Sequence, residues 1–354
     1  MPLTAVAGPT SVAFAGAGWV TVVHGMAAAA VDDVRVVRVA SRTPASARRR
    51  AAQAGAAPAR YDELPGGAEA VVVATPPAAH LAEARRAVEG GALALVETPL
   101  AATLADADAI VALGGQGHVA YAESLVHSPV VAEAVGAGRR LGPLTYLEVR
   151  LAQGRPAPGG GRLTPAWGGG VLLDLGVHAL ALALLLAAPA RVTAVEADLR
   201  PGDDLEVDDD ATVVLTFDGG LTAQVRATWR SAAPVWDAQA ASADSALRVE
   251  LVPDPAVELN GVRLRLPRPP GGLPTDQLHH LGYLDQMRAL AADARAQRPP
   301  RVGAPLGRLL LEVVCAAATS AGTGGPVPLP FAGPRDRTPH ELWTGRGPTG
   351  PAPA

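Results

Sequence analysis

Asp174 and His178 are an acid and a histidine in an otherwise apolar, helix-like stretch. They lie four residues apart in GGGVLLDLGVHALALALLLAA, residues 168–188. At about 3.6 residues per turn, side chains at this spacing lie on one face of a helix, one turn apart. Burying a lone carboxylate is costly, so the two either face a site or form a satisfied pair in the core. Histidine titrates near neutral pH, which suits it to proton transfer.

A second polar group interrupts the apolar run LALVETPLAAT, where Glu97 is followed by Thr98 and Pro99. The chain contains no lysine, because all 30 basic residues are arginine. Schiff-base and proton-transfer chemistry by a side-chain amine is therefore excluded. The Thr98 hydroxyl can donate and accept a hydrogen bond, but its pKa lies far outside the range for acid–base catalysis.

The stretch FAGAGWV places Gly16 and Gly18 between an apolar strand and a helix that starts with Trp19 and Val20. A G-x-G at such a junction lets the backbone approach a pyrophosphate, which the free N–H groups of the helix then bind. Thr21 stands where the dinucleotide fingerprint has its third glycine. This context predicts dinucleotide binding.

The residues after the next strand report on cofactor choice. An acid at this point would bind the ribose 2′-hydroxyl of NAD. The sequence instead has Ser41 and Arg42, so nothing repels a 2′-phosphate and Arg42 can pair with it. We therefore expect NADP, with NAD as the alternative; Arg42 as a solvated loop residue is the other interpretation.

Apolar strands alternate with helices in the first third of the chain, which predicts a parallel sheet covered on both faces. The expected strands are 11–16, 34–40, 70–75, 92–97 and 118–123, and the expected helices are 19–31, 44–55, 78–90 and 103–115. After Glu123 the pattern changes. We expect helices at 129–138, 171–188, 275–297 and 305–320, and a largely antiparallel sheet from strands at 144–153, 191–199, 211–217, 220–230, 235–241, 246–251 and 256–266.

Composition excludes several classes of protein. The net charge is −4, and no basic stripe with interleaved aromatics is visible, which argues against nucleic acid as a partner. The single cysteine, Cys315, excludes a disulfide within the chain. No positive charge precedes Arg35, and the longest apolar stretch, 171–188, contains two polar residues, so neither a signal peptide nor a membrane span is expected. We expect a soluble, cytoplasmic protein.

The remaining polar and aromatic candidates are less specific. The acids at 208–210 are more typical of a solvated turn than of a metal site, and no metal is expected. Glu123 and the His279–His280 pair are candidates to line the site. Three tryptophans could wall a substrate but are equally explained by packing: Trp167, Trp229 and Trp236.

Three stretches in this order resemble the Gfo/Idh/MocA oxidoreductases, the glucose–fructose oxidoreductase and inositol dehydrogenase group. They are GAGWVTVVH (16–24), VVVATPPAAHLAEARRAVEGGALALVETPL (71–100) and GGGVLLDLGVH (168–178). The resemblance implies an α/β Rossmann domain with a parallel sheet over 1–123. It further implies an α+β domain with a large, mostly antiparallel open sheet over 124–330, before a Pro/Gly-rich tail over 331–354. The open sheet would form a homodimer or homotetramer.

The resemblance also assigns roles to residues. It implies that Thr75, Pro76 and His80 lie near the cofactor, as does Glu97. At 97–99 the family usually has Glu-Lys-Pro, whose lysine reaches the nicotinamide ribose and the substrate; here Thr98 replaces it.

For the other motif, the resemblance implies that His178 takes a hydroxyl proton while hydride leaves the same carbon. Asp174 would orient the substrate or hold the imidazole tautomer. The family often has a further acid four residues after the histidine, where this chain has Leu182.

The leading hypothesis is an NADP(H)-dependent oxidoreductase acting on a small hydroxyl, carbonyl or imine compound, with an atypical site that lacks the family lysine. Two alternatives remain. One is a cofactor-retaining enzyme without net redox change, such as a lyase, hydrolase or epimerase. The other is a non-catalytic nucleotide-binding protein.

Overall fold

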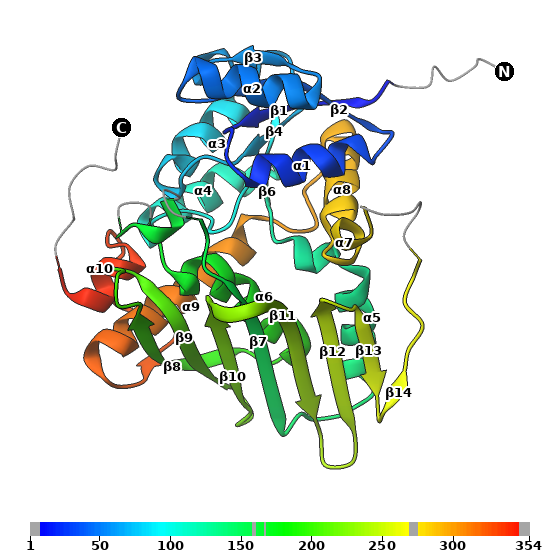
Figure 1. The fold of residues 1–354 in the computed structure, drawn as a ribbon. Helices are drawn as coiled ribbons and strands as arrows, with labels where there is room; N and C mark the ends of the chain where they lie inside the picture. Colours follow the sequence, from blue (N-terminus) through cyan, green and yellow to red (C-terminus); the bar gives the residue numbers. More distant parts are fainter. Residues whose placement is uncertain (1–7, 158–160, 166–167, 269–274, 347–354) are drawn as a thin grey trace.

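Two β-sheets organise the chain (Figure 1). The computed structural model describes residues 8–157, 161–165, 168–268 and 275–346. Trp167, one of the tryptophans considered above, lies outside these ranges. The first sheet comes from the amino-terminal third, and the second from the middle of the chain.

The first sheet has six parallel strands in the order β3-β2-β1-β4-β5-β6. They are β1 (Thr10–Ala15), β2 (Val34–Ala40), β3 (Ala57–Ala59), β4 (Ala70–Val73), β5 (Leu93–Val96) and β6 (Val119–Tyr121). The helices between them are α1 (Val20–Ala29), α2 (Pro44–Ala54), α3 (His80–Glu89) and α4 (Leu104–Leu113). The expected doubly covered parallel sheet is confirmed.

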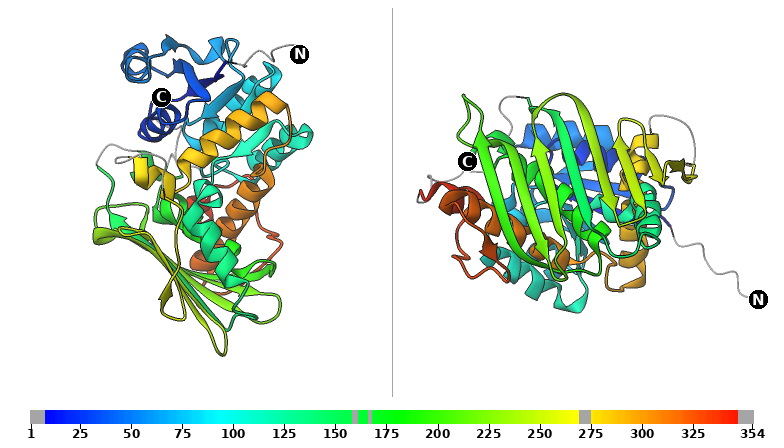
Figure 2. Two further views of the ribbon diagram at one scale, coloured as in Figure 1. Left: turned by 90° about the vertical axis from the view of Figure 1, so that its right-hand side faces the viewer. Right: turned by 90° about the horizontal axis from the view of Figure 1, so that it is seen from below.

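The second sheet has nine strands in the order β14-β13-β12-β11-β7-β10-β9-β8-β15. Every pairing in it is antiparallel except that of β7 with β10. The strands are β7 (Tyr146–Gly154), β8 (Val192–Pro201), β9 (Asp208–Phe217), β10 (Thr222–Thr228), β11 (Arg230–Ala241), β12 (Ala246–Val252), β13 (Ala256–Leu259), β14 (Val262–Arg263) and β15 (Val327–Pro328). The expected mostly antiparallel sheet is confirmed, and Figure 2 shows its helices gathered on one side.

The helices that accompany the second sheet are α5 (Pro129–Gly138), α6 (Val177–Ala187), α7 (Thr275–His280), α8 (Tyr283–Ala296), α9 (Ala304–Thr323) and α10 (Pro339–Thr344). One of them, α8, returns to the first sheet and lies beside α1 (Figure 1). Successive side chains of β1 point to opposite faces of the first sheet, so the strand contributes to packing on both faces. Val12 and Phe14 pack with Met287 of α8, whereas Ala13 and Ala15 belong to the cluster on the other face.

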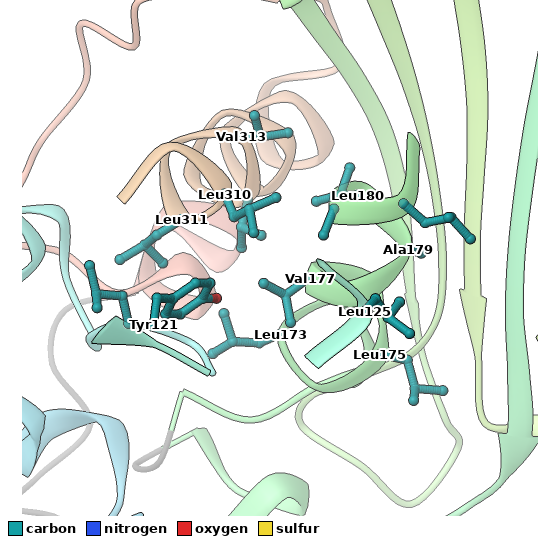
Figure 3. Packing of buried hydrophobic residues seen from close by; sticks show 14 of the residues in the cluster. Tyr121, Leu125, Leu173, Leu175, Val177, Ala179, Leu180, Leu310, Leu311 and Val313 are labelled. Carbon is teal, nitrogen blue, oxygen red and sulfur yellow. The ribbon is translucent and has the colours of Figure 1, made fainter. Parts of the chain in front are cut away.

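Helix α9 forms the centre of the core between the sheets. Its Leu310, Leu311 and Val313 belong to the same buried cluster as Val177 and Leu180 of α6, and Leu310 lies between the two helices (Figure 3). In the described ranges it is the one helix long and apolar enough to cross a membrane, and 67% of its most apolar window is buried inside the molecule. Burial of this kind is typical of a core helix.

Four local features differ from the sequence-based expectations. The helix expected at 171–188 begins with a π-helical turn, Leu172–Gly176. The helix expected at 275–297 is interrupted at Gly282, where φ is +86° and a Cβ would lie 2.0 Å from the Ser124 carbonyl oxygen. The acids at 208–210 begin strand β9 and are buried instead of forming a solvated turn. The carboxy-terminal segment contains α10, which packs on α9.

Candidate active site

The glycine-rich turn after β1 has the shape of a phosphate-binding loop. Gly16 has a φ of +132°, and a Cβ there would lie 2.3 Å from the Ala74 carbonyl oxygen, so only glycine fits. A Cβ on Gly18 would meet nothing within 4 Å, which leaves that side of the turn open. The Thr21 hydroxyl donates to the Gly18 carbonyl at 2.7 Å. Thr21 thus closes the turn at the position of the missing third glycine.

The amino end of α1 is free to bind an anion. Trp19 occupies the cap position, makes no capping hydrogen bond and is 65% exposed, and the helix begins at Val20. The free N–H groups and the helix dipole favour a negative group here. Arg50 of α2, which the sequence analysis did not single out, donates to the carbonyls of Ala17 and Gly18 at 3.4 and 3.2 Å. A dinucleotide pyrophosphate fits this set of groups.

The end of β2 adjoins the same turn. The Gly16 N–H donates to the Ala40 carbonyl at 2.9 Å, which brings the two following residues beside the loop. Ser41 is half-buried and Arg42 is exposed. The residues expected to distinguish NADP from NAD therefore lie next to the phosphate-binding turn.

Thr75, Pro76 and His80 follow strand β4. The Thr75 hydroxyl is buried and has no hydrogen-bond partner among the described residues, so it fits a ligand atom. His80 is 1% exposed, and its Nδ1 and Nε2 lie 3.1 Å from the Pro99 carbonyl and 2.8 Å from the Thr75 carbonyl. His80 therefore holds the loops after β4 and β5 together and does not present its ring to a ligand.

Glu97, at the end of β5, has both carboxylate oxygens engaged. Its Oε1 lies 2.5 Å from His24 Nε2, and its Oε2 accepts the Thr98 N–H at 3.2 Å. His24 comes from α1 and is fully buried; the sequence analysis missed it because one histidine in an apolar helix carries no distinct signal. In this arrangement Glu97 fixes the backbone that carries Thr98.

His178 lies where the two sheets meet. Its Nδ1 lies 2.8 Å from Glu123 Oε2, and Glu123 is completely buried. Its Nε2 lies 3.5 Å from the Thr98 hydroxyl, and the ring stacks on Trp236 with centroids 6.3 Å apart. Thr98, which stands where the resembled family has lysine, is therefore a neighbour of His178. A histidine with one nitrogen held by a buried acid and the other directed at a hydroxyl is organised for proton transfer.

The electrostatics of His178 favour the charged ring. Burial lowers the pKa of His178, but the Glu123 carboxylate and its hydrogen bond outweigh burial, with smaller contributions from Asp174 and Glu97, and the pKa rises from 6.5 to about 8. Near neutral pH the free protein thus holds a proton on His178.

The structure corrects one of the two roles considered for Asp174. Glu123, and not Asp174, holds the imidazole of His178. Asp174 lies in the π-helical turn, where the backbone repeat is wider than in an α-helix, so the spacing of four does not pair it with His178. Its carboxylate instead accepts hydrogen bonds from Arg162, at 3.2 and 3.4 Å, and from Trp229, at 3.3 Å. No sequence pattern identified Arg162 as a neighbour of this acid.

A buried acid caps the helical segment that carries these residues. Asp208 accepts the Leu172 N–H at 2.8 Å, and burial raises the pKa of Asp208 to about 7. The next two acids pair with arginines: Asp209 with Arg155 and Arg230, and Asp210 with Arg226. Among the described residues, no group of three histidines, cysteines or acids is placed to hold a metal ion.

Two family models match the chain, one in the region of each sheet. A model of the oxidoreductase family with an NAD-binding Rossmann fold matches residues 10–123, and a model of the GFO/IDH/MocA C-terminal domain matches residues 131–250. No curated protein matches the chain.

Solved structures show the same fold. GenD2 from gentamicin A biosynthesis, in complex with NAD, shares 23% identity over 91% of this chain and 97% of its own, with a TM-score of 0.79. An aldose–aldose oxidoreductase from Caulobacter crescentus, complexed with glycerol, shares 23% identity over 91% and 100%, with a TM-score of 0.77. An inositol dehydrogenase homologue from Azotobacter vinelandii, complexed with NADH and myo-inositol, shares 21% identity over 91% and 98%, with a TM-score of 0.74.

Proposed function

Because the chain belongs to the Gfo/Idh/MocA oxidoreductase family, we propose that it is an NADP(H)-dependent enzyme that transfers a hydride to or from a small hydroxyl, carbonyl or imine compound. The observation that carries the proposal is the arrangement of His178 between buried Glu123 and the Thr98 hydroxyl. That arrangement supplies one titrating group with a fixed orientation.

The cofactor would be held by the residues around the first sheet. The turn from Gly16 to Val20 would bind the pyrophosphate, Ser41 and Arg42 the 2′-phosphate, and the Thr75 hydroxyl and Pro76 would line the nicotinamide end. When bound, the nicotinamide supplies the acceptor or donor of hydride. Preference for NADP is supported by the absence of an acid at 41–42.

In the oxidative direction, His178 first releases the extra proton that it holds near neutral pH. The substrate hydroxyl or amine then gives its proton to Nε2 while the carbon gives up hydride with its electron pair, and a C=O bond forms from the alcohol or a C=N bond from the amine. Glu123 keeps the Nδ1 proton in place and stabilises the imidazolium that results. In the reductive direction, His178 returns the proton to the oxygen or nitrogen. The Thr98 hydroxyl positions the reacting group by hydrogen bonding and takes no part in acid–base proton transfer.

A direct experiment titrates the purified protein with NADPH and NADH and then follows reduced nicotinamide with a panel of polyols, sugars and their oxidised forms. We expect tighter binding of NADPH, net oxidation or reduction with at least one compound, and loss of turnover in His178→Asn. An Arg42→Ala variant should lose its preference for NADPH but retain binding of NADH. Equal affinities in the wild type would refute the NADP preference.

A second function is favoured by one observation, the threonine at position 98. A lyase, hydrolase or epimerase that retains its cofactor makes no net redox change. The loss of the family lysine favours such a reaction over net hydride transfer. Turnover that leaves the reduced-nicotinamide signal constant would identify that reaction. Cofactor binding without turnover, and without any effect of His178→Asn on ligand binding, would identify a nucleotide-binding protein.

Assembly and location are part of the same proposal. The outer face of the nine-stranded sheet supports a homodimer or homotetramer, because the helices lie on its other side (Figure 2) and Tyr146 of β7 is 45% exposed. Light scattering should report a dimer or tetramer, and Tyr146→Glu should weaken it; a monomeric wild type would contradict this. The single, buried Cys315 supports a reducing, cytoplasmic location, which cell fractionation tests.

A further inference from the structure

Arg162 connects the two halves of the site. It lies in the short 3-10 turn Gly161–Leu163, and its Nη1 donates to both carboxylate oxygens of Asp174. The same guanidinium lies 5.6 Å from the ring centroid of Trp19. Asp174 precedes the helix that carries His178, whereas Trp19 caps α1 at the phosphate-binding turn.

Several N–H donors of the Arg162 guanidinium make no hydrogen bond to the described residues. Among the residues that the structure describes, only the Nη1 of Arg162 donates a hydrogen bond. The side chain is 42% exposed, whereas Asp174 is 16% exposed. An arginine presents five N–H groups in a rigid fork, so its Nε and Nη2 sides are open to an acceptor. The ion pair on one edge and the ring of Trp19 fix the orientation of that fork before a ligand arrives.

The acids near the reaction centre disfavour an anionic ligand unless a cation such as Arg162 lies beside it. Three acids surround the reaction centre, namely Glu97, Glu123 and Asp174, and each raises the pKa of His178. An anionic ligand that approaches these acids is repelled unless a cation lies beside it. The family usually supplies lysine at the position of Thr98, and this chain has no lysine. Arg162 is the arginine bonded to one of these three acids.

We infer that Arg162 is an anion-binding residue of the active site, which takes a phosphate or carboxylate oxygen of the bound ligand on its Nε and Nη2 groups. The ligand group is the cofactor pyrophosphate or an acid on the substrate. Asp174 and Trp19 act as positioning residues for the guanidinium. The inference rests on the proposed binding of a dinucleotide.

The test compares Arg162→Gln and Arg162→Lys with a matched control, Arg226→Gln. Arg226 also pairs with a buried aspartate, Asp210, at 3.2 Å and is similarly exposed, at 48%. It lies on the opposite face of β10 from Ala227, which packs near the π-helical turn. NADPH and ADP are titrated into each protein, and thermal melts check that all of them fold.

We expect Arg162→Gln to weaken binding of NADPH and ADP by about tenfold or more, Arg162→Lys to restore part of the affinity because it keeps charge without the fork, and Arg226→Gln to bind like the wild type. A second arm titrates glucuronate and glucose into the NADPH-saturated proteins. Loss confined to glucuronate assigns the anion to the substrate, and loss confined to NADPH and ADP assigns it to the cofactor. Unchanged affinities in both arms overturn the inference. A wild type that binds no NADPH refutes the proposed function instead.

Discussion

Replacing Glu123 with glutamine should move the pKa of His178 from about 8 to below 6.5. Burial lowers the pKa of His178, and the Glu123 carboxylate, 2.8 Å from Nδ1, is the largest influence that raises it. Glutamine keeps an oxygen that accepts the Nδ1–H bond but carries no charge. Burial, the largest single influence on the ring, is then opposed by the smaller influences of Asp174 and Glu97. The change corresponds to about 2 kcal/mol or more of lost preference for the charged ring.

An NMR titration measures this without knowledge of the substrate. The chain has 8 histidines, and the Cε1–H signal of His178 is the one absent from His178→Asn. Its midpoint should fall in Glu123→Gln and fall less in Asp174→Asn, since that carboxylate does not contact the ring. The raised pKa of His178 also makes the stability of the folded state depend on pH. His178 stabilises the folded state below about pH 6.5 and loses this effect as the pH rises through about 8. A midpoint that stays near 8 in Glu123→Gln would refute the assignment of Glu123.

Three further changes test other parts of the site. Thr98→Lys should raise the rate of hydride transfer by about tenfold or more, followed by the absorbance of reduced nicotinamide; a slower rate would mean that the site is built around threonine. Between about pH 5 and 8, the Tm of Asp208→Asn should fall less than the Tm of the wild type. The raised pKa of Asp208 stabilises the folded state fully below the pKa of the unfolded chain, and this stabilisation is lost as the pH passes about 7. Parallel curves of Tm against pH would argue against this role of Asp208. Gly16→Ala should weaken NADPH binding by more than about tenfold, since the new Cβ collides with a carbonyl oxygen, whereas Gly136→Ala, with open space around it, should bind normally.

Much of the fold follows from local patterns. The second strand and the helix at 129–138 have the same bounds in the structure as in the sequence analysis, because apolar periodicity ends there at turn residues. The break at Gly282 was not predictable in this way. It is set by contact of α8 with the segment after Glu123, which is remote in sequence. The return of α8 to the first sheet has the same origin in tertiary packing.

In the candidate site, too, some features follow from local sequence patterns and others only from tertiary packing. The glycine turn and His178 were predicted from local motifs. The partner of His178 was not, because Glu123 is 55 residues away and reaches it only when α6 packs against the end of the first sheet. Asp174 was expected to share a helical face with His178, and the π-helical turn redirects it to Arg162. Helical periodicity holds only where the backbone follows the α-helical repeat.

A crystal structure with NADP bound tests the central claim most directly. The account predicts the pyrophosphate over the turn from Gly16 to Val20, with C4 of the nicotinamide facing Nε2 of His178 across a space that a substrate carbon can occupy. A cofactor seated elsewhere, or a nicotinamide that turns away from His178, would contradict it.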